Sequence, residues 1–230
     1  MTKAETALQG PEIPKKRLVA RIYRPQGEGS QTSTHFEYDA QGRKLRETFG
    51  DRQGIKIKES EYKYDDKGNV VEVLSTTFDV SGKIVSKHTE LIEYDDQNRE
   101  IHNSMINSNG ATYFESKNEY DNHGRLAKTE SYSINSEGGV EPPTATEHIY
   151  DEAINKETVV TKDRFGIVSR TIEIQTDEQG REISVSKNSN GEITAISERE
   201  YDSQGEPIKD VTKDAKGEVV STMEWENRYE

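Results

Sequence analysis

The chain repeats itself every 56 residues. Tyr38-Asp39, Tyr94-Asp95 and Tyr150-Asp151 are spaced by this distance, and a second pair of Tyr-Asp steps keeps the same interval. Glycines follow the same register, at Gly54, Gly110 and Gly166, and at Gly68 and Gly124. A fixed period without insertions indicates that the chain is an array of one small structural unit.

Turn signals recur every 11 to 17 residues along this array. Each is a four-residue pattern with Asp or Asn first and Gly fourth. The side chain at the first position caps its own turn, and the glycine accepts a positive φ. Asn98 replaces glycine in one turn, because Asn tolerates the left-handed region. The structural turn residues are Asp39, Gly42, Gly54, Asp65, Gly68, Gly82, Gly110, Asp121, Gly124, Gly166, Gly180 and Gly205.

The segments between turns read as β-strands. In the stretch 55–59 the apolar side chains fall on one face, and no segment keeps a helical period. The sequence therefore predicts an all-β fold: an antiparallel β-hairpin array of about fifteen short strands, an elongated or curled single sheet with a four-strand, 56-residue repeat. Alternate turns should lie on opposite edges, so the Tyr-Asp turns should share one edge, with tyrosines about 9.5 Å apart.

The composition limits the core. Only 30% of the residues are hydrophobic, 33% are charged and the formal net charge is -13. Such values approach those of disordered chains, but fixed glycine spacing and an excess of Ile, Val and Tyr over Leu favour ordered strands. We therefore expect an ordered but thinly packed β protein.

Two regions are expected. Residues 1–30 carry a net charge of +3 and are predicted to be a basic, partly flexible N-terminal arm. Residues 31–230 form the hairpin array, with a possible bend or long loop at 137–146 around the Pro-Pro pair. The chain has no cysteine and no apolar N-terminal segment, so we expect a cytoplasmic protein, or one exported without a cleavable signal peptide.

Two segments resemble a known repeat. The stretches 38–45 and 120–126 follow the pattern Tyr-Asp-x-x-Gly-Arg followed by Leu or Lys-Leu. They are similar to the YD repeat of bacterial Rhs proteins, wall-associated proteins, Tc-toxin shells and teneurins. The resemblance implies β-hairpins in a bacterial protein, because those repeats build hairpins that spiral into a hollow shell. Shell formation itself is not carried over, since this chain is too short to close such a shell and no toxin domain follows.

No motif indicates catalysis. The five histidines have no spacing that places two metal ligands on one face. The Asp-rich turns lack the glutamate of a calcium loop, and there is no nucleophile or phosphate-binding motif. We expect no enzyme activity, no cofactor and no metal.

The sequence predicts a binding or scaffold module that presents a β surface to a protein or glycan. The candidate contact residues are Tyr62, Tyr64, Tyr94, Tyr113, Tyr120, Tyr132, Tyr150 and Tyr201. The negative charge argues against nucleic acid, and no membrane insertion is expected; a monomer is favoured. The alternative is an acidic immunity or chaperone-like protein that neutralises a basic toxin partner.

Overall fold

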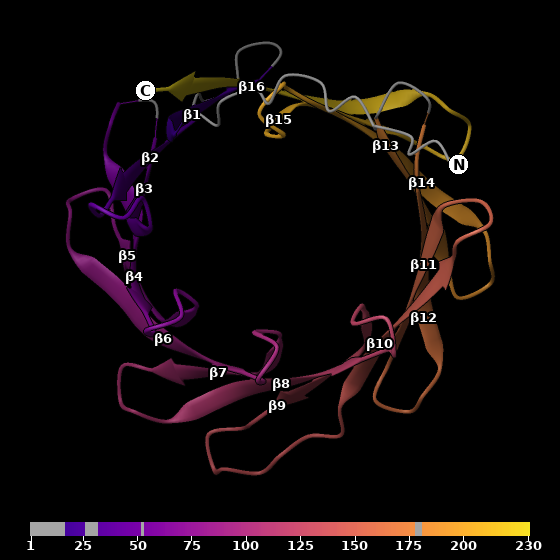
Figure 1. Ribbon diagram of the computed structural model, residues 1–230, viewed down its shortest axis with the longest axis horizontal. Coiled ribbons are helices and arrows are strands. Elements are labelled where there is room, and N and C mark those ends of the chain that lie inside the picture. Colours follow the sequence, from indigo (N-terminus) through magenta and orange to yellow (C-terminus); the bar gives the residue numbers. More distant parts are fainter. Residues whose placement is uncertain (1–16, 26–31, 52, 178–180) are drawn as a thin grey trace, which may run out of the picture.

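The protein is a closed antiparallel barrel of sixteen strands. The computed structural model describes residues 17–25, 32–51, 53–177 and 181–230. Figure 1 shows the strands as a ring around an open centre. The strands are β1 (Leu18–Pro25), β2 (Thr32–Tyr38), β3 (Lys44–Gly50), β4 (Lys56–Tyr64), β5 (Val70–Phe78), β6 (Ile84–Tyr94), β7 (Glu100–Asn107), β8 (Thr112–Tyr120), β9 (Leu126–Ser133), β10 (Thr144–Asp151), β11 (Lys156–Lys162), β12 (Val168–Thr176), β13 (Glu182–Asn188), β14 (Ile193–Tyr201), β15 (Pro207–Lys213) and β16 (Val219–Tyr229).

The barrel is an up-and-down meander closed by its first and last strands. Every strand pairs with its neighbours in sequence, and β1 also pairs with β16, from Leu18↔Tyr229 to Pro25↔Met223. Two further backbone bonds extend this seam: Arg17 N donates to Glu230 O at 3.3 Å and Glu230 N donates to Arg17 O at 3.1 Å. Both ends of the described chain therefore lie at the same rim.

The predicted all-β hairpin architecture is confirmed, but the predicted open or curled array is wrong. The sixteenth strand is β1, which lies within the segment 1–30 that the sequence assigns to a basic arm. Its pairing with β16 joins residues some 200 positions apart, for which no local signal exists. Closure also leaves no unpaired sheet edge.

The turns form as their residues require. In the first, Gly42 N donates to Asp39 O at 3.0 Å and Gly42 has a φ of 82°. Asn98 adopts a φ of 61° in the same role. Gly180 lies outside the described residues. The predicted loop contains the turn at 135–138 and continues to β10, with one bridge between Ile134 and Val140.

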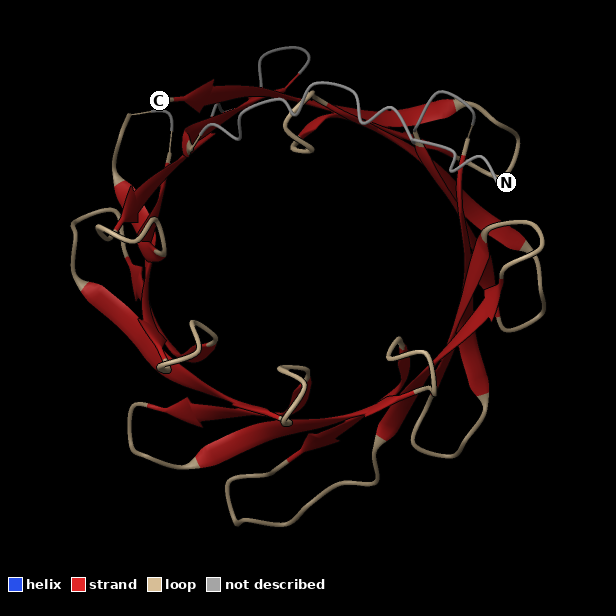
Figure 2. Ribbon diagram, viewed as in Figure 1, coloured by secondary structure: helices blue, strands red, loops and turns tan. Residues whose placement is uncertain are grey.

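The two rims differ. The Tyr-Asp rim carries the turns after Tyr38, Tyr64, Tyr94, Tyr120, Tyr150 and Tyr201, the turn that begins at Asp177 between β12 and β13, and Arg17 and Glu230. The opposite rim carries the remaining turns. Most hairpins contain a β-bulge just after the turn. In the first hairpin, the pairing register shifts where Glu37 and Tyr38 of β2 face the start of β3. A bulge of this kind bends its strand. Figure 2 shows short turns inside the outline of the ring and other loops projecting outside it.

The pairing register divides the strands into two consistent faces. Tyr62 pairs with Val73 and Val73 with Glu90 on one face, whereas Glu61 pairs with Leu74 and Leu74 with Thr89 on the other. Side chains on the concave side of a closed sheet converge and shield one another. The face with Tyr62, Tyr64, Ile92, Tyr94, Asn118 and Tyr120 is half-buried, and the face with Glu61, Lys63, Leu91, Glu93, Lys117 and Glu119 is exposed. We assign the first as the inner face and the second as the outer face.

The interior is wet rather than packed. No described side chain is less than 2% exposed, and only Leu18, Ala20, Ile22 and Val73 are buried apolar residues. The accessible surface is 15427 Å², whereas a compact protein of this mass exposes about 10,500 Å². Sixteen strands at about 4.8 Å spacing and about 40° tilt enclose a backbone ring about 30 Å across. The lumen is therefore a water-filled space bounded by a single layer of sheet.

Candidate functional site: the Tyr-Asp rim and the inner face

Each Tyr-Asp turn is held by its aspartate. Asp95 Oδ1 accepts hydrogen bonds from the backbone N of Gln97 and of Arg99, both at 2.9 Å, and Oδ2 accepts one from Arg99 Nε at 2.7 Å. The hydrogen bonds from the backbone and side chain of Arg99 lower the pKa of the Asp95 carboxyl. The same geometry recurs at Asp39, Asp121 and Asp177, each with an arginine four residues later.

Five tyrosines of these turns donate hydrogen bonds to backbone carbonyls of the neighbouring hairpin. The hydroxyl of Tyr120 donates to Glu100 O at 2.7 Å, and that of Tyr64 donates to Lys44 O at 2.7 Å. Tyr38, Tyr94 and Tyr150 make the equivalent bonds to Leu18 O, Val70 O and Leu126 O. Burial raises the pKa of these phenols. The five hydroxyls therefore link successive hairpins along the rim.

The arginines occupy the spaces between the tyrosines. Arg43 lies over the Tyr64 ring, 4.8 Å from its centroid, and Arg99 lies 4.6 Å from that of Tyr120. Arg17 over Tyr38 and Arg125 over Tyr150 repeat the contact. The series is interrupted at Asn69, whose amide instead donates to Asn98 Oδ1 at 3.2 Å. The rim is thus a chain of Asp–Arg ion pairs and cation–π contacts.

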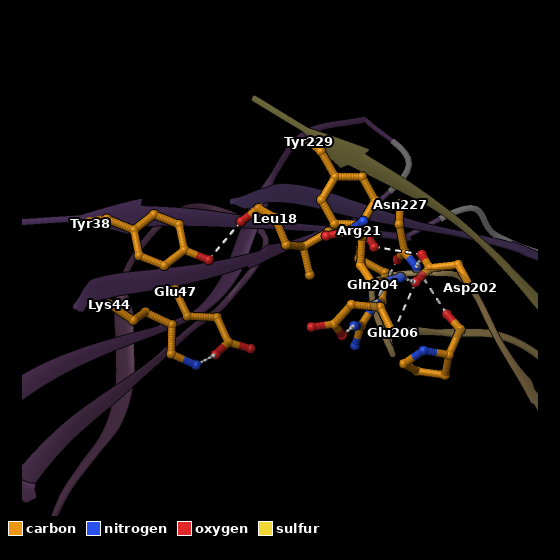
Figure 3. Close-up of polar contacts among 11 residues, drawn as sticks. Leu18, Arg21, Tyr38, Lys44, Glu47, Asp202, Gln204, Glu206, Asn227 and Tyr229 are labelled. Carbon is orange, nitrogen blue, oxygen red and sulfur yellow. Dashed lines mark hydrogen bonds and ion pairs between the residues drawn. The ribbon is translucent and has the colours of Figure 1, made fainter. Parts of the chain in front are cut away.

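The seam has its own polar cluster at this rim. Tyr229 donates to Asp202 Oδ2 at 2.5 Å, and Asn227 donates to the same oxygen at 3.1 Å. Arg21 donates to Asn227 Oδ1 at 3.1 Å and pairs with Glu206. Figure 3 shows these residues converging from β1, β16 and the turn between β14 and β15. Burial and the hydrogen bond to Asp202 raise the pKa of the Tyr229 phenol.

The inner face is rich in hydroxyl and amide groups. Ser60 and Ser75 share a hydrogen bond of 3.0 Å, and Thr129 donates to Asn118 Oδ1 at 2.7 Å. The face also carries an ion pair: Arg199 Nη2 lies 2.7 Å from Asp210 Oδ2.

An aromatic cluster lies on the inner face beside the Tyr-Asp rim. Lys44 Nζ lies 4.4 Å from the Tyr62 ring centroid and 5.5 Å from that of Phe36. The same ammonium pairs with Glu47 Oε2 at 2.8 Å, and Tyr62 donates to that oxygen at 2.9 Å. The cluster therefore presents aromatic faces beside an ion pair, Lys44–Glu47, whose charges balance each other.

Two shallow clefts lie at the Tyr-Asp rim. One, of about 310 Å³, is lined by residues of β10 to β13 including Tyr150, Glu157 and Thr176. The other, of about 350 Å³, lies at the seam between Arg17, Tyr38, Gln204 and Tyr229. Both are lined mainly by polar groups, so they can hold polar molecules but offer no dry pocket.

The eight tyrosines predicted as contact residues do not form one row. Tyr64, Tyr94, Tyr120, Tyr150 and Tyr201 lie at the Tyr-Asp rim, while Tyr62 is on the inner face. Tyr113 lies at the opposite rim, and Tyr132 is on the outer face, where it donates to Glu130 Oε2 at 2.7 Å. Their role in binding stays a prediction.

Sequence reasoning missed the arginines and the seam. Arg43, Arg99 and Arg125 follow the turn glycine or asparagine directly. This constant position could have predicted that these arginines stack on the tyrosines of the rim. The contacts of Arg21, Asn227 and Tyr229 depend on closure, so no local pattern announced them. Among the described residues, no group of three or more His, Asp or Glu side chains could hold a metal ion, and no helix is long and apolar enough to cross a membrane.

Comparisons with known proteins support the barrel. No protein-family model and no curated protein matches the chain. A porin-like protein from Bacteroides uniformis has a similar structure, with a TM-score of 0.56, 10% identity, and coverage of 94% of this chain and 99% of that one. This likeness shows the fold alone.

Tc-toxin structures, one of the classes that the YD-repeat resemblance names, are also among the matches. The Photorhabdus luminescens Tc holotoxin pore is 10% identical, with coverage of 86% of this chain and 15% of that one and a TM-score of 0.22. A TcdB2-TccC3 structure is 12% identical, with coverage of 81% and 14% and a TM-score of 0.23. TM-scores this low do not establish a shared fold or a shared function.

Proposed function

We propose that this protein is a non-enzymatic binding barrel whose lumen holds an uncharged polar chain, namely a glycan. The observation that carries the proposal is the division of side chains between the two faces. Hydroxyls, amides and aromatic rings face inward, together with ion pairs such as Lys44–Glu47. The outer face carries Lys–Glu pairs such as Lys162–Glu147 and Lys187–Glu173. A glycan needs many hydroxyl and amide partners together with flat aromatic surfaces, which the inner face supplies.

The middle of the inner face suits such a ligand. Ser116 pairs with Ser131, Ser131 with Thr144, and Asn118 with Thr129 across three neighbouring strands. These short polar side chains leave room and present donors and acceptors in both directions. The aromatic cluster of Phe36 and Tyr62 lies on the same face, nearer the Tyr-Asp rim.

The outer face supports a barrel that works in water. It carries ion pairs such as Lys162–Glu147 at 2.6 Å and Lys187–Glu173 at 2.7 Å. A barrel inserted in a bilayer instead presents an outward apolar band flanked by aromatic residues. The charged ladder is therefore the basis for proposing that no membrane surrounds this barrel.

The test compares lumen and outer-face variants. Binding of uncharged oligosaccharides, such as cellohexaose and chitohexaose, is measured by titration calorimetry for the full chain, for Ser131→Trp and for Ser104→Trp. Ser131 lies on the inner face and Ser104 on the outer face two strands away. We expect Ser131→Trp to weaken binding about tenfold or more, because the indole fills lumen space, and Ser104→Trp to leave it unchanged.

Two results would overturn the proposal. Equal effects of both variants would place the ligand outside the lumen. Binding of an unstructured uncharged peptide, with none of any oligosaccharide, would show that the lumen selects polypeptide. Retained β-type circular dichroism is required of each variant.

One observation favours the alternative of an acidic protein that captures a basic partner. Carboxylates gather at the Tyr-Asp rim: the Glu152 side chain is 73% exposed, and Asp66 and Asp96 are exposed beside their turns. Charges so placed speed association with a basic protein, and salt screens them. An association rate with a basic protein such as lysozyme that falls steeply between about 0.05 and 0.5 M salt would favour this function.

A further inference from the structure

The opposite rim concentrates the exposed apolar side chains of the described chain. Among the described residues, six large apolar residues keep 62% or more of their area exposed, and all lie at this rim: Val80, Val85, Val140, Phe165, Ile167 and Val220. Val85 and Val220 are the second residues of β6 and β16, and the other four lie in or beside turns. Val80 and Phe165, at turn tips, are 86% and 72% exposed. We call these six residues the apolar rim.

The apolar rim follows the barrel mouth. Its members come from the turns between β5 and β6, β9 and β10, β11 and β12, and β15 and β16. Monomeric proteins seldom expose large apolar side chains in such concentration unless the surface binds something. The Tyr-Asp rim has no comparable set among the described residues: its most exposed large apolar residues are Ile149 and Ile154, at 56% and 54%.

We propose that the apolar rim binds the apolar rim of a second copy of this chain, so that two barrels meet mouth to mouth. A closed barrel has no free strand edge, so two copies cannot join by extending a sheet. Contact between identical rims about a two-fold axis is the simplest self-complementary arrangement. The two lumens then form one chamber, with a Tyr-Asp rim at each end.

The charges of this rim fit an identical partner better than a membrane. Two of its turns carry one acid and one base each, Asp79 with Lys83 and Asp163 with Arg164. A third carries Lys216 between Asp214 and Glu218, and the fourth carries Glu137 and Glu141. A two-fold axis can place the acid of one copy opposite the base of the other. An anionic lipid surface would be repelled by the acids and would prefer a rim rich in lysine alone.

The exposed area is sufficient. From their exposed fractions, the six side chains present on the order of 700 Å² on each copy, before the polar turn atoms are added. Stable interfaces bury about 800 Å² per partner. A rim-to-rim contact therefore lies in the range of a specific dimer rather than that of a chance encounter.

Sedimentation of the full chain tests the proposal. We expect a dimer at concentrations of tens of micromolar, and a dissociation constant raised about a hundredfold in the double variant Val80→Asp with Phe165→Asp. The matched control is Ile154→Asp, since Ile154 is 54% exposed in a turn of the Tyr-Asp rim. This control should dimerise normally. A monomeric wild-type chain at every concentration, or a dimer unaffected by the double variant, would overturn the proposal.

A second measurement does not depend on altering the apolar rim. The chain has no cysteine, so one introduced thiol can carry a bulky polyethylene glycol maleimide. Ser189 and Ser203 are both exposed second residues of their turns, at the opposite rim and the Tyr-Asp rim respectively. We expect the label on Ser189→Cys to block dimerisation and that on Ser203→Cys to leave it intact; the reverse result would refute the model.

A vesicle control tests the remaining candidate partner of the apolar rim, a lipid surface. Flotation with phosphatidylcholine–phosphatidylglycerol vesicles should recover none of the wild-type chain. Flotation that the double variant abolishes would identify a lipid surface as the partner and overturn the proposal of a second copy.

Discussion

At the scale of single residues, the tyrosine hydroxyls of the Tyr-Asp rim carry structure. Tyr120 donates to Glu100 O at 2.7 Å while its ring lies under Arg99. Tyr120→Phe keeps the ring and removes the donor, leaving a carbonyl without that partner. We expect a loss of about 1 kcal/mol in unfolding free energy, measured by urea denaturation.

The matched control is Tyr113→Phe, because the Tyr113 hydroxyl contacts only the Met105 sulfur, at 3.5 Å. This variant should change the free energy of unfolding by less than about 0.5 kcal/mol. Equal losses in the two variants would show that linkage between hairpins contributes nothing specific at Tyr120.

The tyrosines and aspartates of this rim contribute to the pH limits of stability, and Tyr120 and Asp95 are examples. Burial raises the phenol pKa of Tyr120 above 10.0, so its contribution is present below pH 10 and is lost as pH rises through the folded value. Hydrogen bonds from Arg99 lower the pKa of Asp95 below 3.8, so that contribution is present above this pH and is lost as pH falls through the folded value. Thermal midpoints should form a plateau between these limits.

Two variants test the assignment of each limit. Tyr120→Phe should make the alkaline decline shallower by the share of one phenol among several with raised pKa. Asp95→Asn should make the acid decline shallower by the share of one carboxyl among several with lowered pKa. Neither variant should change the other decline. Parallel shifts of both limits in either variant would mean that general charge repulsion, rather than these two groups, controls the pH dependence.

At the scale of elements, the seam between β1 and β16 decides whether the barrel exists. Deleting residues 1–25 removes β1 and leaves β2 and β16 with unpaired edges. Free edges template pairing between copies. We expect the truncated chain to form large assemblies by light scattering, and a synthetic β1 peptide added in excess to suppress them. A truncated chain that stays monodisperse would show that the remaining strands close without β1.

The elements also show how far sequence reasoning reaches. Hairpins could be predicted because the geometry of a turn such as 121–124 is determined by its own aspartate, which accepts backbone hydrogen bonds, and its glycine, which adopts a positive φ. Closure could not be predicted, because β1 and β16 pair although they lie at opposite ends of the sequence. The residues of β1 were assigned to a basic arm from their charge alone. The stacked arginines were missed because cation–π pairs such as Arg99 and Tyr120 join different hairpins. Individual turns can therefore be predicted from the sequence, whereas closure of the barrel depends on the curvature of the whole sheet.

At the scale of the whole molecule, a wet lumen changes the thermodynamics of unfolding. A chain of 26.1 kDa exposes about 37,800 Å² when unfolded, and a compact fold would bury about 27,300 Å² of it. With 15427 Å² still exposed over the whole chain, only about 22,400 Å² is buried, or about four-fifths as much. Because m-values and heat capacity changes scale with this area, both should reach only about 80% of the values for compact proteins of equal length.

The measurement is a joint fit of urea and thermal unfolding to one transition. Tyr113→Phe, which leaves the lumen unchanged, should show the same m-value as the wild-type chain. Ser131→Trp adds a buried indole edge to the inner face and should raise the m-value slightly. A wild-type m-value equal to that of compact proteins would mean that the barrel collapses in solution, and binding within the lumen would then lose its physical basis.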